Sequence, residues 1–254
     1  MSHRVRRPVL AGNWKMNKGP QDATSFFAAF LDNYTARKDR TIIFFPPALS
    51  FAASVRAVGE RSDIHLGVQN IHWEENGAFT GEISAAIAAQ AEAEWVLAGH
   101  SERRHVFGET DEETGRKCAA ALAAGLIPIA CIGETLEQRE AGQLQEVLLR
   151  QLDAVLNAIP ADAADRIVIA YEPVWAIGTG VNATPGDAAE AHAVIRARLT
   201  ERYGKKPAGH IPILYGGSVK PDNAAHLLSA AGVDGLLVGG ASLDPVAFAR
   251  ISAV

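Results

Sequence analysis

Short apolar runs recur along the chain, and none of them alternates cleanly between apolar and polar residues. A strand with one face in water alternates, whereas a strand that is buried on both faces is apolar throughout. The runs therefore predict eight buried strands of a parallel sheet, at residues 8–12, 41–45, 64–68, 95–98, 127–132, 166–170, 211–214 and 235–238.

Segments of helical length lie between these runs and carry apolar side chains at helical spacing. Residues 21–37 carry an aromatic stripe, and residues 136–159 carry a stripe of leucines and valines. A third helix is predicted to open at Thr184 and to run to Tyr203. Residues 119–133 form the longest near-apolar stretch, which is too short for a membrane span and predicts a helix that runs into a strand.

Strands that alternate with helices indicate βα units and a parallel sheet. Eight such units in 254 residues, with no linker between them, are typical of an α/β protein with a single-domain (β/α)8 barrel, here over residues 1–254. The alternative is a doubly wound open sheet, which would normally carry a glycine-rich nucleotide fingerprint after its first strand. The sequence there reads Gly12-Asn13-Trp14-Lys15, and the lack of that fingerprint favours the barrel.

The charge and the cysteines restrict the classes of partner. A formal net charge of -5 argues against binding to nucleic acid or membranes through overall charge, so an anionic ligand needs a local site. The two cysteines, Cys118 and Cys131, have no metal-binding spacing and form no disulfide framework, which suits a cytoplasmic protein. The apolar run near the N-terminus is too short for a secretion signal.

Polar residues and glycines collect directly after the predicted strands. In a barrel the carboxyl ends of the strands meet at one rim, where active sites lie. Each residue alone can be read as a solvated charge, a structural histidine or a turn glycine, but their common placement favours a site. They are Asn13 and Lys15 after strand one, His100 and Glu102 after strand four, Glu172 after strand six, Ser218 after strand seven, and Gly239 and Gly240 after strand eight.

These residue types match proton transfer beside a carbonyl group. Glu172 can remove the proton, while His100 and Lys15 polarise the carbonyl oxygen and stabilise the negative charge that develops on it. Ser218 and the backbone N–H groups of the late glycines can bind a phosphate. The sequence contains no visible nucleotide motif or cluster of metal ligands, so neither a cofactor nor a metal is expected.

An apolar loop follows Glu172 and runs from Val174 to Gly180, with Pro173 stiffening its start. Loops are usually polar, because their backbone faces water. The apolar sequence therefore indicates either a lid that closes over the site and excludes water or a loop that packs permanently on a neighbour. The pattern alone favours neither.

Seven stretches of the chain resemble the triosephosphate isomerase family, in family order and over essentially the whole length. They are AGNWKMN, GAFTGEIS, GHSERR, CIGETLEQRE, YEPVWAIGTG, LYGGSVK and LVGG, which begin at Ala11, Gly77, Gly99, Cys131, Tyr171, Leu214 and Leu237. The resemblance implies a TIM barrel that interconverts dihydroxyacetone phosphate and D-glyceraldehyde 3-phosphate in glycolysis and gluconeogenesis. It also implies that the substrate is a small phosphorylated triose and that no cofactor takes part.

The resemblance assigns roles to the residues at the rim. Glu172 is expected to be the general base, His100 the electrophile and Lys15 the cationic contact to the substrate. The implied catalytic set is Glu172, His100, Lys15, Asn13 and Glu102, and the implied substrate-binding set is Asn13, Lys15, Gly178, Ser218, Gly239 and Gly240. Val181 and Asn182, after the lid, depart from the family pattern but belong to neither set.

The loop from Asn76 to Gly81 carries an apolar tip at Phe79, and an exposed phenylalanine lowers the solubility of a monomer. The tip is not expected to bury Phe79 locally. The resemblance implies that this loop docks into the second subunit of a homodimer and brings Thr80 near the partner's catalytic site.

Two other functions share part of the pattern. A barrel isomerase for a different phosphorylated sugar would keep the late glycines but would not need Lys15, His100 and Glu172 together. A non-catalytic barrel would tolerate the loss of Glu172, which is present here.

Overall fold

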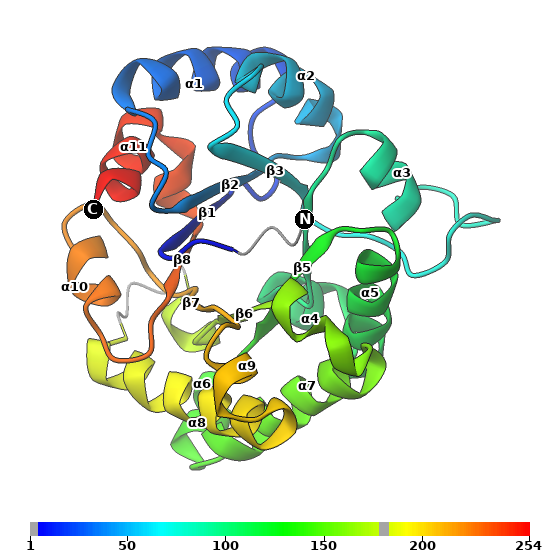
Figure 1. Cartoon of the computed structure of the whole chain (residues 1–254), viewed down its shortest axis with the longest axis vertical. Coiled ribbons are helices and arrows are strands. Elements are labelled where there is room, and N and C mark those ends of the chain that lie inside the picture. The colour runs from blue at the N-terminus through cyan, green and yellow to red at the C-terminus, as the bar shows by residue number, and fades with distance from the viewer. Residues whose placement is uncertain (1–4, 178–182) are drawn as a thin grey trace.

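The strands form a closed ring, and the helices surround it (Figure 1). The computed structural model describes residues 5–177 and 183–254. All neighbouring strands are parallel, and pairing of the last strand with the first closes the ring. The eight strands in the described residues are β1 (Val9–Asn13), β2 (Thr41–Phe45), β3 (Ile64–Val68), β4 (Trp95–Ala98), β5 (Ile127–Ile132), β6 (Val168–Tyr171), β7 (Ile213–Tyr215) and β8 (Gly235–Val238). The predicted α/β class and (β/α)8 barrel are confirmed.

Three strands begin later than the sequence predicts, and each of them also ends one residue later. β1 begins at Val9 and β7 at Ile213, in both cases directly after a proline. Pro8 and Pro212 have no N–H group to donate to a ladder, so the apolar run extends beyond the paired strand. β6 begins only at Val168, where its pairing with β5 starts.

Helices lie between successive strands. They are α1 (Pro20–Asn33), α2 (Ala48–Val58), α3 (Ala85–Gln90), α4 (Ser101–Phe107), α5 (Asp111–Ala123), α6 (Leu136–Glu140), α7 (Leu144–Ala158), α8 (Pro185–Tyr203), α9 (Lys205–Ala208), α10 (Ala224–Leu228) and α11 (Pro245–Ala253), with 3-10 turns η1 (Ala161–Arg166), η2 (Val174–Ala176) and η3 (Gly240–Leu243). Within the described residues, no helix is both long enough and apolar enough to cross a membrane.

The single helix predicted over residues 136–159 is wrong, because the chain forms α6 and α7 instead. Gly142 between them has a φ of 71°, a left-handed conformation that interrupts a helix. The helix predicted over residues 21–37 is also too long, since Tyr34 already has an extended backbone. The helix predicted from Thr184 to Tyr203 is confirmed: Thr184 caps α8 by accepting a hydrogen bond from the N–H of Asp187.

Two apolar layers hold the barrel together. One fills its interior with side chains from every second position of the strands, such as Ile43 and Ile129. The other packs the strands against the helices, and its aromatic centre is Phe44 of β2. The Phe44 ring contacts the predicted stripe of α1 and one ring of α11, which are Phe26, Phe27, Phe30 and Phe248. These contacts anchor β2, whose ladder with β1 ends at Asn13, two residues before Lys15.

Gly235 allows β8 to approach β1 closely. A Cβ atom at this position would lie 2.1 Å from the carbonyl oxygen of Val9. We expect Gly235→Ala to lower the free energy of unfolding by about 3 kcal/mol, measured by chemical denaturation, because the backbone must shift. The control is Gly186→Ala in α8, where the nearest atom is Thr184 Oγ1 at 3.5 Å and little change is expected. Equal destabilisation by both substitutions would contradict the steric explanation.

His192 of α8 is fully buried, and its ring meets Tyr171 edge to face. Its Nδ1 atom lies 2.9 Å from the carbonyl oxygen of Gly232, whereas its Nε2 atom is buried without a partner in the described part of the chain. A carbonyl only accepts, so Nδ1 carries the proton of a neutral imidazole. Burial lowers the pKa of His192 from 6.5 to about 4.

This pKa shift predicts a loss of stability in acid. Because the folded pKa lies below the unfolded one, the contribution of His192 is complete above pH 6.5 and is lost progressively towards pH 4. The loss amounts to about 3 kcal/mol. We expect His192→Gln, which keeps a donor for Gly232 but does not titrate, to show a shallower fall in unfolding free energy over this range. If unfolding free energy fell equally steeply with pH in the wild type and in His192→Gln, His192 would not be the source of the acid sensitivity.

Candidate active site

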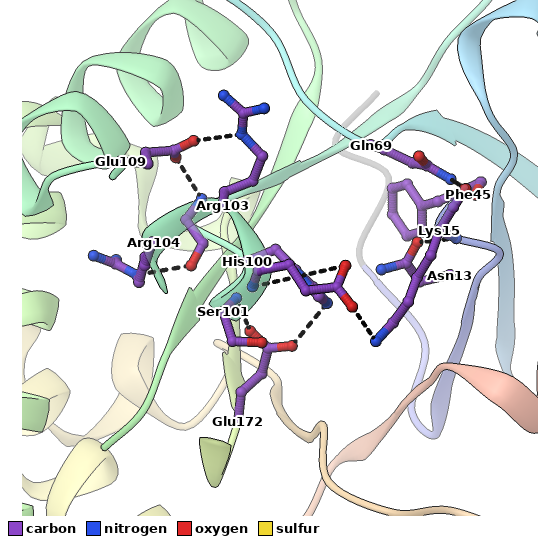
Figure 2. A network of polar contacts seen from close by, with 12 residues as sticks. Asn13, Lys15, Phe45, Gln69, His100, Ser101, Arg103, Arg104, Glu109 and Glu172 are labelled. Atoms are coloured by element: carbon purple, nitrogen blue, oxygen red, sulfur yellow. Dashed lines mark hydrogen bonds and ion pairs between the residues drawn. The ribbon is translucent and has the colours of Figure 1, made fainter. Parts of the chain in front are cut away.

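The structure brings most of the predicted site residues to one rim. Asn13 ends β1, His100 lies between β4 and α4, and Glu172 directly follows β6. Figure 2 shows His100, Ser101 and Glu172 facing one another, with Lys15 approaching from the side of β1. The remaining predicted positions at this rim are Glu102, Ser218, Gly239 and Gly240, while Gly178 lies outside the described residues.

Glu172 and His100 form a close pair in which both side chains are buried. One carboxylate oxygen of Glu172, Oε1, lies 3.0 Å from His100 Nε2. The other, Oε2, accepts a hydrogen bond of 2.8 Å from the backbone N–H of Ser101. A buried carboxylate is costly unless its oxygens are paired, and here both are.

The hydrogen bonds of His100 determine which ring nitrogen carries a proton. The backbone N–H of Glu102, in the first turn of α4, lies 3.2 Å from His100 Nδ1. Since an N–H group can only donate, Nδ1 is the unprotonated nitrogen. The proton of the neutral imidazole is therefore on Nε2, which donates towards Glu172. The ring presents a hydrogen-bond donor to the centre of the rim.

Lys15 combines an unusual backbone with a paired ammonium group. Its φ of 52° is in the left-handed region, where a residue with a side chain costs about 1–3 kcal/mol. Its backbone N–H donates to Asn13 Oδ1 at 2.9 Å. Its Nζ atom lies 2.6 Å from Glu102 Oε1, and its Cε atom is 3.4 Å from the place that a Cβ of Gly239 would occupy. Lys15 thus bridges the ends of β1, β4 and β8.

Two glycines make room for Glu172. A Cβ at Gly133, which follows β5, would lie 1.8 Å from the backbone oxygen of Glu172. A Cβ at Gly216, which follows β7, would lie 2.9 Å from Glu172 Cγ. The chain that follows β5 and the chain that follows β7 therefore both approach Glu172 closely.

The start of the predicted lid is held to the barrel by Glu134, a fully buried residue. The indole Nε1 of Trp175 donates to Glu134 Oε1 at 2.8 Å, and the hydroxyl of Tyr171 donates to the same oxygen at 3.0 Å. Burial, and secondarily the negative charge of Glu134, raise the pKa of Tyr171, so its phenol remains a donor. The structure describes this loop as far as Ile177.

Some residues of the rim were not anticipated from the sequence. Gln69 and Glu134 follow β3 and β5, so their positions after predicted strands could have drawn attention to them. Glu109 follows a helix, and no local signal marks it, yet it accepts the backbone N–H of Gly99 at 2.9 Å. Burial favours a raised pKa for Glu109, but Lys117 and Arg103 outweigh this effect and the pKa is lowered.

The loop from Asn76 to Gly81 projects outward from the ring between β3 and α3 (Figure 1). Phe79 is 43% exposed, although its ring packs on His72 with centroids 4.3 Å apart. The side chain therefore remains exposed, as expected, although His72 covers part of its ring. Other exposed apolar side chains follow the first four strands; they are Met16, Leu49, Ile87, Val106 and Phe107.

Residues 5–177 and 183–254 contain no group of three or more His, Cys, Asp or Glu side chains that could hold a metal ion. The polar groups of the rim offer instead one carboxylate, one imidazole donor and one ammonium group. Together they can move a proton and stabilise negative charge on oxygen.

Known proteins match this chain over nearly its whole length. The family model described as triosephosphate isomerase matches residues 8–254. The triosephosphate isomerase of Solibacter usitatus is 47% identical, over 97% of this chain and 99% of its own. That of Symbiobacterium thermophilum is 48% identical, over 98% of this chain and 97% of its own. The crystal structure of triosephosphate isomerase from Bartonella henselae has a TM-score of 0.86 and 42% identity, covering 97% of this chain and 98% of that one.

The family, the sequence relatives and the fold therefore agree, and they confirm the resemblance drawn from the sequence. The reaction is that of an aldose–ketose isomerase, an intramolecular oxidoreductase acting on a phosphorylated triose. This chain belongs to the triosephosphate isomerase family and interconverts dihydroxyacetone phosphate and D-glyceraldehyde 3-phosphate, a reaction of glycolysis.

Proposed function

We propose that Glu172, His100 and Lys15 carry out the isomerisation within a single barrel domain that spans the chain. The observation that carries this proposal is the approach of Glu172 Oε1 to 3.0 Å from His100 Nε2 at the barrel rim. Glu172 removes a proton from the hydroxyl-bearing carbon beside the carbonyl group and returns it to the former carbonyl carbon, while the hydroxyl proton passes to the former carbonyl oxygen. The ketose and aldose thus interconvert through an enediolate.

His100 and Lys15 stabilise the oxygen atoms of that enediolate. A substrate that binds between Glu172 and His100 receives the Nε2–H donor that now faces the carboxylate. Asn13 holds the backbone of Lys15 and Glu102 holds its ammonium group, which keeps the cation at the rim. This family is itself the standard example of a neutral histidine beside a carboxylate base, so these roles follow from family membership and the geometry supports them.

The phosphate of the substrate is assigned to the part of the rim that follows β7 and β8. Ser218 offers a hydroxyl group, and the chain turns at Gly239 and Gly240, where backbone N–H groups can approach an anion. Lys15 lies against Gly239, which places a cation beside this region. Gly178 on the proposed lid completes the phosphate contacts. Closure of that lid excludes water and prevents loss of phosphate from the enediolate.

The proposal includes a homodimer in the cytoplasm. The loop from Asn76 to Gly81 docks into the second copy. The second copy in turn covers the exposed apolar side chains that follow β1 to β4. Each copy gives one loop and receives one, so the assembly closes at two. Cys118 and Cys131 are buried thiols without a disulfide, which suits a reducing compartment.

Glu172→Gln tests the assignment of the base. The amide keeps the shape of the side chain but cannot take the proton, so turnover should fall by roughly 10²- to 10⁴-fold. A coupled assay measures turnover in both directions, and calorimetry with a phosphorylated non-reacting analogue measures binding, which should persist. Glu146→Gln, on the exposed face of α7, is the control. Turnover of Glu172→Gln close to that of the control would contradict the role of Glu172.

Replacement of Phe79 by Gly together with Thr80 by Asp tests the assembly. Loss of the apolar tip and a new charge should dissociate the dimer and lower activity, because the docked loop no longer supports the partner's site. The control is Val246→Asp, an exposed apolar residue of α11 remote from the loop. Light scattering and activity are measured together over a dilution series. A wild-type chain that is monomeric and fully active would refute the proposal.

A further inference from the structure

We infer that Gln69 is a positioning residue that sets the location of the Lys15 ammonium group. The inference rests on the proposed role of Lys15 as the cationic contact to substrate. Gln69 lies directly after β3 and reaches across the rim to the chain that follows β1 (Figure 2). No feature of the reaction requires a glutamine at this point, so its use has to be explained by the groups that it touches.

The amide of Gln69 holds two backbone carbonyl groups at once. Its Nε2 atom donates to Lys15 O at 2.8 Å and to Phe45 O at 2.8 Å. Carbonyl groups only accept, so the NH2 end of the amide faces them and both of its hydrogens are used. Phe45 O also accepts the backbone N–H of Trp14 at 3.2 Å. The end of β2 and the loop after β1 are therefore joined through the side chain of one residue that follows β3.

Both backbone groups of Lys15 are held by side-chain amides. Asn13 Oδ1 accepts its N–H, and Gln69 Nε2 donates to its C=O. Lys15 needs this support because its positive φ of 52° is unfavourable for a residue with a Cβ atom. A strained conformation persists only where the surroundings determine it. Without Gln69, the peptide after Lys15 is free to rotate towards an ordinary conformation.

A rotation at this point moves the ammonium group much further than the backbone. Nζ stands at the end of a flexible four-carbon side chain, between Glu102 Oε1 at 2.6 Å and the turn at Gly239. Misplacement of a catalytic group by about 1 Å can cost about 10²-fold in rate. Gln69 therefore acts on the substrate through Lys15.

The same loop has a second tether that provides a matched control. Ser50 Oγ donates to Lys18 O at 2.6 Å, so Ser50→Ala also removes a side-chain bond to a backbone carbonyl of the loop. Ser50 touches neither backbone group of Lys15. A purely structural role for Gln69 predicts similar consequences for the two variants once their stabilities are matched.

The test compares Gln69→Met, which keeps the volume but removes the donors, with Ser50→Ala. The probe is 2-phosphoglycolate, a phosphorylated acid that cannot isomerise, and its affinity is measured by calorimetry. We expect Gln69→Met to weaken binding and to raise KM by about tenfold, the effect of two neutral hydrogen bonds. Ser50→Ala should change both by less than about twofold. If both variants changed affinity and KM in proportion to their loss of thermal stability, the inference would be overturned.

A double-mutant cycle with Lys15→Met separates this inference from the proposed function. If Gln69 acts through Lys15, then Gln69→Met weakens 2-phosphoglycolate binding in the wild-type background. In the Lys15→Met background, the same substitution causes no further loss of affinity. Additive effects would overturn the positioning role while leaving Lys15 as the cationic contact. Unchanged binding by Lys15→Met alone would instead refute the proposed role of Lys15. Light scattering accompanies each measurement and reports the state of assembly. If the affinity of Gln69→Met for 2-phosphoglycolate recovered at higher protein concentration, its defect would come from assembly and the inference would be overturned.

Discussion

The ladder between β8 and β1 is the constraint on which the rest of the structure depends. It pairs residues from opposite ends of the chain, Val9 with Gly235 through Gly12 with Val238, and so converts an open sheet into a ring. Once the ring is closed, the carboxyl ends of the strands share one rim. Lys15 from the start of the chain then lies against Gly239 near its end.

Closure also explains why polar groups occur in pairs at the rim. Lys15 is held by Glu102, and Glu172 is held by His100, so each pair joins residues that follow different strands. The carboxylate of Glu172 is buried and requires such a partner, since an unpaired buried charge would cost several kcal/mol of desolvation. The same pairs keep the groups oriented before substrate binds. Electrostatic stabilisation of a transition state depends on that preorganisation.

Much of the fold could be predicted because burial on both faces gives a strand a continuous apolar sequence. The site residues that directly follow these strands, such as His100 and Glu172, could be predicted for the same reason. The helix break at Gly142 could not, since a glycine inside a helical segment is often tolerated and its left-handed φ is a property of the folded chain. Glu109 could not be predicted either, because it reaches Gly99 from the far end of α4.

The sequence by itself determined the order of strands and helices and the chemical groups that follow each strand, because these depend on local periodicity and composition. Only the tertiary structure decided which of those groups touch. Glu172 Oε1 lies against His100 Nε2, and one of the two carbonyl groups that Gln69 holds belongs to Lys15, 54 residues away. Such contacts have no local signature: the two residues become neighbours only when the strands that carry them are paired into one closed ring.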